Sequence, residues 1–399
     1  MAEALGGLLV VDFSRVLAGP YATMLLADLG AEVIKVERPG GGDDTRAWGP
    51  PFAGGESTYF LGLNRNKRSV ALDLADPADA EVARTLAARA DVVVENFRTG
   101  TMERLGLGYD ALRAVNPRLV HCSITGFGAD GGAGLPGYDL IVQAVGGLMS
   151  VTGPAGEGGT KAGVALVDVL TGLHAAFGVL AALRHRDATG EGQRVEVSLL
   201  TSLLSGLVNH SSAYVAADVV PAAMGNRHPS IAPYELFDTA DRPLVIAAGN
   251  DRQFGALCAA VGRPELAADS RYAANEGRVA HREELVRELS AALVRHDADR
   301  WFAELTAAGV PCGPVNDLAD AFGLAARLGL NAEVSVADPR RDAPVRQVAN
   351  PVRLSATPPA YRSAPPRLDE DGPGVRELAA RWAAEAARDG REDARDEGA

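Results

Sequence analysis

Asp168 is the one acidic residue in an otherwise apolar run over residues 163–170. A carboxylate in such a run must be paired, protonated or placed at the end of a helix. Taken locally, the pattern favours a helix N-cap, with the helix beginning near Leu170. The functional alternative is a nucleophile, because backbone N–H groups at the start of a helix stabilise a carboxylate charge beside an electrophile.

The loop at residues 38–46 has the composition of an anion-binding segment. Arg38 and Arg46 flank three glycines, which let the backbone approach a ligand, and each guanidinium can grip a phosphate or carboxylate with two hydrogen bonds. The alternative is an exposed loop whose charges are solvated, and the residues alone favour neither interpretation.

A second arginine-bearing segment is Asn96-Phe97-Arg98, with Arg104 about one helical turn further on. Phe97 can stack on a base, and Arg104 can supply positive charge. In isolation, a core phenylalanine and a surface arginine explain these residues more simply.

Other polar and aromatic candidates are more ordinary when taken alone. Tyr59, Tyr138 and Asp139 are then two half-buried aromatic residues and a helix cap. Among the seven histidines, His228 lies in a Gly/Pro-containing linker and is the one expected to contact a ligand. No histidine pair has the spacing of metal ligands, so no metal is predicted. The three cysteines are far apart, which indicates free thiols in a reducing compartment.

The elements that position these residues alternate along the first third of the chain. Apolar, β-rich runs are followed by helical patterns, which predicts a parallel, doubly wound α/β sheet with ligands at the carboxyl ends of its strands. The first strand lacks a following G-x-G-x-x-G turn, which disfavours a nicotinamide or flavin enzyme. The predicted strands are residues 8–13, 31–37, 69–74, 91–95 and 118–124, with loops at 14–20, 38–48, 96–100 and 125–136.

The length of 399 residues is enough for two domains, or for one large domain with a smaller one inserted. We expect a large Rossmann-like domain over residues 1–218, a linker over 219–233, a small α/β domain over 234–325, and a return to the large domain over 326–399.

Charge and hydropathy predict the setting of the protein. A formal net charge of −13 argues against a nucleic-acid partner. The first residues lack the basic and apolar segments of a signal peptide, and apolar stretches are interrupted before they reach a membrane-spanning length. We therefore expect a cytoplasmic protein without a membrane partner.

Several motifs occur together in an order that resembles family III CoA-transferases, the group of the formyl-CoA and carnitine CoA-transferases. The resemblance extends from about residue 5 to residue 358, and residues 42–60 and 249–254 most resemble the succinyl-CoA:glutarate CoA-transferases of that family. The motifs are Val11-Asp-Phe-Ser-Arg-Val-Leu-Ala-Gly-Pro20, Asp28-Leu-Gly-Ala-Glu-Val-Ile-Lys-Val-Glu-Arg-Pro39, Asn64-Arg-Asn-Lys-Arg-Ser69, Val94-Glu-Asn-Phe97 and Ser123-Ile-Thr-Gly-Phe-Gly128.

The resemblance implies a role for each matching position. It makes Asp168 the aspartyl nucleophile, which forms a transient covalent adduct with coenzyme A, and it implies no permanently bound cofactor. It also implies an interlocked homodimer of Rossmann-like chains. The expected coenzyme A contacts are Val16, Arg38, Leu72, Asn96, Phe97, Arg104, Gly137, Tyr138 and Asp139, together with Arg98 beside Phe97.

The expected substrates are an acyl-CoA, succinyl-CoA or a similar dicarboxylyl-CoA, and a small carboxylic acid. Arg15, Arg46, Tyr59 and His228 are candidate contacts for the acid. Backbone N–H groups near Gly249 and at the start of the Asp168 helix are candidates to stabilise an oxyanion.

The alternative activity is that of an α-methylacyl-CoA racemase. Racemases related to this family have a catalytic histidine where this chain has Tyr138. A tyrosine does not act as a base near neutral pH without a large shift of its pKa. Transfer of CoA is therefore the favoured prediction.

Overall fold

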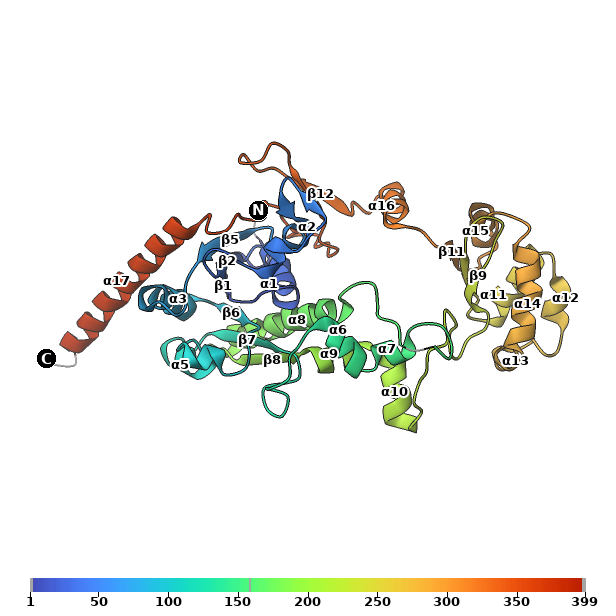
Figure 1. Ribbon diagram of the computed structural model, residues 1–399, viewed down its shortest axis with the longest axis horizontal. Helices are drawn as coiled ribbons and strands as arrows, with labels where there is room; N and C mark the ends of the chain where they lie inside the picture. The colour runs from blue at the N-terminus through green and yellow to red at the C-terminus, as the bar shows by residue number, and fades with distance from the viewer. Residues whose placement is uncertain (1–2, 158, 397–399) are drawn as a thin grey trace. The chain divides into compact units, whose positions relative to one another are not determined.

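The computed structural model describes residues 3–157 and 159–396 of the chain (Figure 1). Their contacts divide the chain into two compact units. The first comprises Met1–Gly146, Ala162–Asp218 and Leu330–Ala399, and the second comprises Gly147–Lys161 and Val219–Gly329. The segment Gly147–Lys161, expected in the large domain, therefore packs with the second unit.

The first unit is built on a six-stranded sheet in the order β5-β2-β1-β6-β7-β8, and all five pairings are parallel. This confirms the expected α/β class with a large parallel sheet. The strands are β1 (Leu9–Asp12), β2 (Glu32–Glu37), β5 (Lys67–Ala71), β6 (Val92–Glu95), β7 (Val120–Thr125) and β8 (Arg194–Ser198).

Helices cover both faces of this sheet. On one face, α1 and α8 pack together and against the strands, and on the other face α3 contacts α5 and α17. The helices are α1 (Ala18–Asp28), α2 (Thr58–Leu61), α3 (Pro77–Arg89), α4 (Thr101–Arg104), α5 (Tyr109–Val115), α6 (Asp139–Val145), α8 (Leu166–Thr189), α9 (Leu199–Gly206), α10 (Val208–Ala217) and α17 (Gly372–Asp396). Short elements complete the unit: the 3₁₀ turn η1 (Asp44–Ala47) and the hairpins β3 (Phe52–Ala53) with β4 (Glu56–Ser57), and β12 (Glu333–Val336) with β13 (Val345–Val348).

Strand periodicity places apolar and charged residues on opposite faces of β1. Val11 and Phe13 point into the core beneath α3 and α17, whereas Asp12, between them, is fully buried on the face of α1. Lys35 on β2 and Lys67 on β5 are buried on the same side as Asp12. The sheet therefore carries a charged layer beneath α1, which apolar patterning alone does not predict.

The strand order reverses direction at β1. From this strand the sheet continues through β2 and β5 on one side and through β6, β7 and β8 on the other. The loops after β1 and β6 meet at the reversal: Asn96 Oδ1 accepts from Arg15 N at 2.9 Å, and Asn96 Nδ2 donates to Arg15 O at 2.8 Å. This is the crevice where doubly wound sheets bind ligands.

Helix α8 begins at Leu166, four residues earlier than expected from the sequence. Asp168 is therefore in the first turn, and the N-cap is Ala165, which makes no side-chain capping bond. By length and composition α8 could cross a membrane, contrary to the expected interruption of apolar stretches, but one side of it packs in the first unit. A long apolar helix of this kind packs one side in the core of the unit and leaves its other side exposed.

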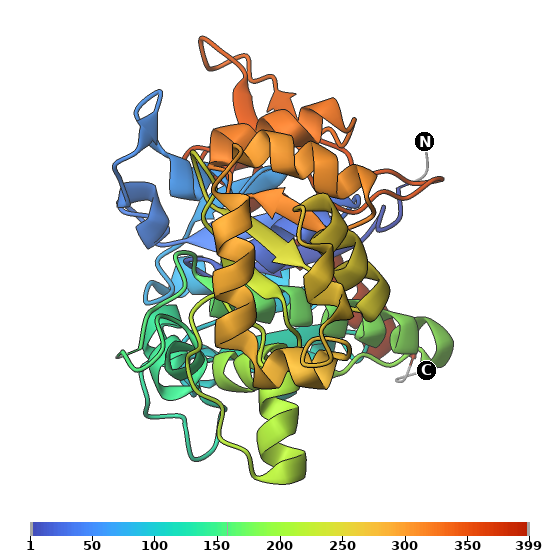
Figure 2. The same cartoon turned by 90° about the vertical axis from the view of Figure 1, so that its right-hand side faces the viewer.

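The second unit contains a three-stranded antiparallel sheet, β11-β10-β9, beside a cluster of helices (Figure 2). Its core includes Phe254, Leu285, Leu289 and Trp301. The elements are α7 (Leu148–Val151), β9 (Tyr234–Phe237), β10 (Leu244–Ala247), α11 (Asp251–Ala260), α12 (Pro264–Ala268), α13 (Asn275–Ala280), α14 (Arg282–Leu293), α15 (Ala298–Ala307), β11 (Cys312–Pro314) and α16 (Leu318–Arg327).

The segment before α17 completes the edge of the large sheet. Asp369 Oδ1 accepts from Ala71 N at 2.8 Å, and Asp371 Oδ2 accepts from Ser69 N at 2.9 Å, so two carboxylates satisfy donors of the edge strand β5. Val375 of α17 is buried in the same hydrophobic core as Val11 and Phe13. A capped edge has fewer free N–H groups for pairing with another chain.

Candidate active site

A cavity of about 860 Å³ lies at the carboxyl ends of the first unit's strands. Asp168 forms part of its wall, with Leu199 at the start of α9 and Trp48 after η1. The cavity brings together most of the residues predicted from the sequence. Those in its lining are Arg15, Val16, Asn96, Phe97, Arg98, Arg104, Gly137, Tyr138 and Asp168.

A second, smaller cavity of about 300 Å³ adjoins the first, since Arg15 and Phe97 line both. Its wall is mostly apolar and includes Leu72, which is buried, and Phe97, which is half-buried. Arg38 lies in the lining as well. A flat apolar slot beside a guanidinium is suited to a purine base that carries phosphate groups.

Two arginines are joined by one carboxylate where the cavities meet. Asp44 Oδ2 lies 3.3 Å from Arg15 Nη1, and Asp44 Oδ1 lies 2.6 Å from Arg38 Nη2. The Arg15 guanidinium also lies 6.0 Å from the centre of the Phe97 ring. Asp44 thus holds two cations in the position that a phosphate between the cavities would need.

Asp168 is a half-buried carboxylate whose environment disfavours its charge. Burial raises the pKa of Asp168 to about 7, and the neighbouring Asp139 carboxylate contributes to this rise. A pKa this high places the ionisation of the Asp168 carboxyl group close to neutral pH. A carboxylate with little hydration is more reactive toward an electrophile than one in bulk water.

Asp139 takes the place of an N-cap for α8, although it belongs to α6. Its Oδ1 accepts from Val167 N at 2.8 Å and from Asp168 N at 3.1 Å. Gln143 Nε2 donates to Asp139 Oδ2 at 2.6 Å and fixes the carboxylate. Asp139 therefore holds the backbone of Asp168 and does not line either cavity. The free helical N–H groups that we expected at the start of α8 are already bonded.

Tyr59 and Trp48 form the side of the site next to Asp168. Their rings meet edge to face at 5.3 Å and line an open recess of about 500 Å³. Burial and the charges of Asp168 and Asp139 raise the pKa of Tyr59 to about 12. Its hydroxyl group therefore stays protonated and can donate a hydrogen bond to an anionic oxygen.

One predicted substrate contact in the first unit, Arg46, has structural partners instead. Arg46 is corrected to a structural role, because its Nε and Nη2 donate to Glu37 at 2.8 and 2.6 Å and its guanidinium stacks on Phe60 at 3.7 Å. His228 and Gly249 belong to the second unit. There His228 Nδ1 accepts from Ser230 N at 3.1 Å.

The backbone N–H of Gly249, a predicted oxyanion donor, is also engaged. It donates to Gln253 Oε1 at 3.0 Å within the second unit. Tyr59, whose pKa is raised in part by the Asp168 charge, is a candidate donor in the first unit. The sequence gives no local signal for this role, because the pairing of Tyr59 with Trp48 depends on the turn between them.

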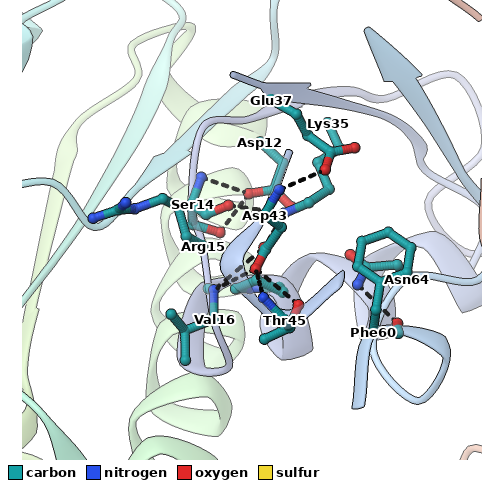
Figure 3. A network of polar contacts seen from close by, with 12 residues as sticks. Asp12, Ser14, Arg15, Val16, Lys35, Glu37, Asp43, Thr45, Phe60 and Asn64 are labelled. Atoms are coloured by element: carbon teal, nitrogen blue, oxygen red, sulfur yellow. Dashed lines mark hydrogen bonds and ion pairs between the residues drawn. The ribbon is translucent and has the colours of Figure 1, made fainter. Parts of the chain in front are cut away.

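A network of buried charges lies behind the loop after β1 (Figure 3). Asp12 accepts from Ser14, from Thr23 Oγ1 at 2.6 Å and from Lys67 Nζ at 3.1 Å. Lys35 Nζ lies 2.9 Å from Asp43 Oδ2. Lys35 inside the apolar strand β2 is the sequence signal for this network, because a buried ammonium needs a partner.

Residues 5–372 match the model of CoA-transferase family III. The chain belongs to this family. A "Succinyl-CoA:glutarate CoA-transferase" of Mus musculus is 44% identical over 321 residues, which are 80% of this chain and 74% of the mouse protein. A "Succinate--glutarate CoA-transferase" of Agrobacterium fabrum is 42% identical over 364 residues, 88% of this chain and 90% of that protein.

The fold of this CoA-transferase is similar to that of a solved relative. The crystal structure of a CAIB/BAIF family protein from Brucella suis superposes with a TM-score of 0.85 at 41% identity, over 95% of this chain and all of that chain. The family assignment gives the two cavities a chemical meaning. A small apolar cavity, an arginine pair and an adjoining larger cavity with a carboxylate in its wall suit coenzyme A, whose thiol must reach the reacting group.

Proposed function

We propose that the enzyme transfers CoA from an acyl-CoA to a free carboxylic acid through a covalent intermediate on Asp168. The observation that carries this proposal is the placement of Asp168: a half-buried carboxylate with a pKa raised to about 7, in the wall of a cavity that continues into a slot for a base. A purely structural N-cap would accept backbone N–H groups, whereas here Asp139 performs that task.

The chemistry begins with the ionised Asp168. Its oxygen attacks the thioester carbonyl, the C–S bond breaks, and the products are a mixed anhydride and CoA thiolate. The thiolate then attacks the Asp168 carbonyl carbon and releases the donor acid as a carboxylate. The enzyme now carries an aspartyl-CoA thioester.

The second half runs in reverse with the acceptor acid. Its carboxylate attacks the aspartyl carbonyl and expels CoA thiolate, which then attacks the acceptor's acyl carbon and frees Asp168. The thioester bond energy is kept throughout, so the scheme needs no ATP. The Tyr59 hydroxyl is the proposed donor to the oxyanions that form at Asp168.

The donor in this proposal is succinyl-CoA or a similar dicarboxylyl-CoA. Both curated relatives described above have names with succinate or succinyl-CoA and glutarate, which supports small dicarboxylic acids as donor and acceptor. A panel of CoA esters against free acids, followed by chromatography of the new CoA ester, tests this choice. Turnover with monocarboxylic acids alone would contradict it.

We further propose a cytoplasmic homodimer. Leu173, Phe177 and Leu180 form an exposed apolar stripe on α8, and Phe177 is 73% exposed. A second copy of the chain would cover such a stripe at no cost in polar desolvation. The free thiols Cys122 and Cys258, both buried, are consistent with a reducing compartment.

Mass spectrometry tests the covalent intermediate. Enzyme incubated with succinyl-CoA should gain a CoA adduct on Asp168 that hydroxylamine removes, and Asp168→Ala should lose both adduct and transfer. Transfer by the Asp168→Ala enzyme would rule out the mechanism. Exchange of the α-proton with deuterium in the absence of an acceptor acid would favour the racemase instead.

A further inference from the structure

Val16 has a backbone conformation that its side chain disfavours. Its φ is 69°, in the left-handed region, which β-branched residues rarely adopt. Such strain persists only where surrounding contacts hold it. Val16 is half-buried and lines the large cavity together with Asp168, so a fixed conformation there shapes the wall that coenzyme A would meet.

Asp43 is the side chain that holds the Val16 backbone. Val16 N donates to both carboxylate oxygens of Asp43 at 3.3 Å (Figure 3). Thr45 fixes the same carboxylate, since its N and Oγ1 donate to Asp43 Oδ1 at 3.0 and 2.8 Å. Asp43 is 2% exposed, so these bonds are made away from water and each is expensive to lose.

Lys35 completes the arrangement from beneath. The Lys35 ammonium lies 2.9 Å from Asp43 Oδ2 and donates to Ser14 O at 2.9 Å. The same buried cation therefore binds both the loop after β1 and the carboxylate that holds this loop. Burial alone would raise the pKa of Asp43, but the Lys35 charge and the hydrogen bonds hold it below its usual range. Both groups are therefore charged at neutral pH.

We propose that the buried Lys35–Asp43 pair is a positioning device that holds Val16 in its left-handed conformation and so fixes the loop that forms the coenzyme A wall. The proposal rests on the proposed function, in which this cavity binds coenzyme A. Asp43 and Lys35 line the smaller cavity, but their polar groups are committed to the loop. They act through Val16, whose apolar side chain then faces the ligand.

A double-mutant cycle tests the device, because glycine adopts the left-handed region without strain. We expect D43N to weaken CoA binding about tenfold, because the strained Val16 conformation is no longer held and the loop relaxes. In a V16G background the same D43N change should cost less than about threefold, since no strain remains to be held. Calorimetry with CoA itself measures all four proteins, and steady-state kinetics should show the D43N effect in KM more than in kcat.

The T45V substitution is a milder test than D43N, because it leaves the Lys35–Asp43 ion pair in place. It removes only the Thr45 Oγ1 bond to Asp43, and it should weaken CoA binding by a few-fold in the wild type and less in the V16G background. This cycle decides the question even where D43N does not yield folded protein.

D28N is the matched control. Asp28 and Arg65 form an equally buried ion pair at 2.6 Å in the same unit, with no bond to the loop after β1. Its effect on CoA binding should be the same with and without V16G. Equal costs of D43N or T45V in the two backgrounds would overturn the proposal. CoA binding needs no covalent step, so loss of the Asp168 mechanism and failure of this proposal are separate results.

Discussion

The Asp139 carboxylate on α6 lies close to Asp168 on α8, the proposed nucleophile. Asp139 bonds the backbone of Asp168 and also places a negative charge beside its side chain. The first effect orients the nucleophile, and the second raises its pKa. A nucleophile with a pKa near the working pH combines a substantial ionised fraction with high basicity.

The activity should depend on the ionisation of Asp168. We expect kcat/KM for the acyl-CoA to rise with pH through one midpoint near 7, because only the carboxylate attacks. Asp139→Asn should move this midpoint to lower pH, since one of the two causes of the raised pKa is removed and burial remains. A pH profile for each enzyme checks both statements. An unchanged midpoint in Asp139→Asn would contradict the assigned cause.

The same raised pKa predicts that the nucleophile destabilises the folded protein. Between the ordinary pKa of 3.8 and about 7, the folded state holds a proton that the unfolded state has released. The favourable contribution of this proton is complete below the ordinary pKa and is lost as the pH rises through 7. Asp168→Asn removes the titration.

Asp168→Asn should therefore be more stable than the wild type at alkaline pH. The expected gain is about 1–2 kcal/mol at about pH 8, reduced from the full pKa shift because the side chain keeps some hydration. Urea unfolding at this pH and at about pH 4, where the gain should disappear, checks the sign. A variant less stable at both pH values would show that Asp168 has a structural role.

At this scale, the local sequence singled out Asp168 as unusual, the family resemblance implied its role as nucleophile, and neither predicted its surroundings. Asp168 stands out because it interrupts an apolar run, and the arginines stand out because they follow strands. The capping partner Asp139 and the pairing of Arg46 with Glu37 depend on how loops fold back, and no local pattern records that. The pairing of Arg46 with Glu37 shows that an arginine near a predicted site can have a structural role and no ligand contact.

At the scale of elements, the site depends on the close approach of α1 and α8. Gly172 makes this approach possible, because a Cβ at this position would lie 2.6 Å from Ala18 O in the backbone of α1. Both helices begin at the large cavity, with Ala18 and Asp168 in its wall. Their separation therefore sets the width of the channel at the nucleophile.

Gly172→Ala should separate the two helices. Alanine normally stabilises a helix by about 1 kcal/mol over glycine, but here the added methyl group meets backbone and should cost about 2 kcal/mol net. Activity should fall with it. Gly255→Ala in α11 is the control, because nothing lies within 4 Å of its added Cβ, and it should be slightly stabilising. Thermal unfolding and kcat/KM of both variants separate the effect of helix–helix packing from that of intrinsic helix propensity.

Elements with a strong apolar pattern were predictable, and those set by tertiary contacts were not. The strand Arg194–Ser198 and the parallel strands before it follow from β-rich runs between helical segments. The start of α8 was placed too late because its capping group comes from another helix. The β12–β13 hairpin and α16 were absent from the prediction; the two strands of the hairpin are only four residues each and are separated by a loop with two prolines.

At the scale of the whole molecule, the first unit exposes apolar side chains in a helical pattern. Positions 173, 177 and 180 lie on one side of α8, while Val167 and Ala175 are buried in the unit. Helix α10 adds exposed residues, including Val208 and Val215. The dimer proposal rests on these exposed surfaces. A helix at an interface between two chains can have the same length and apolarity that make α8 resemble a membrane span.

Phe177→Arg should weaken self-association at least about tenfold, because it places a charge in the apolar stripe. Light scattering coupled to size-exclusion chromatography should find a dimer for the wild type and a concentration-dependent shift to monomer for the variant. Val115→Arg, at a similarly exposed position on α5, should leave the dimer intact. A monomeric wild type would contradict the proposal outright.

The bridge from Asp44 to Arg15 and Arg38 means that the protein supplies its own anion to its cationic site. A tethered carboxylate competes at every concentration of small anions, so inorganic phosphate or a free dicarboxylate gains little by binding there. A ligand that also fills the apolar slot has additional binding energy to displace or share the bridge. In the proposed reaction, we therefore expect the two substrates, a nucleotide thioester and a bare acid, not to compete for this pair of arginines.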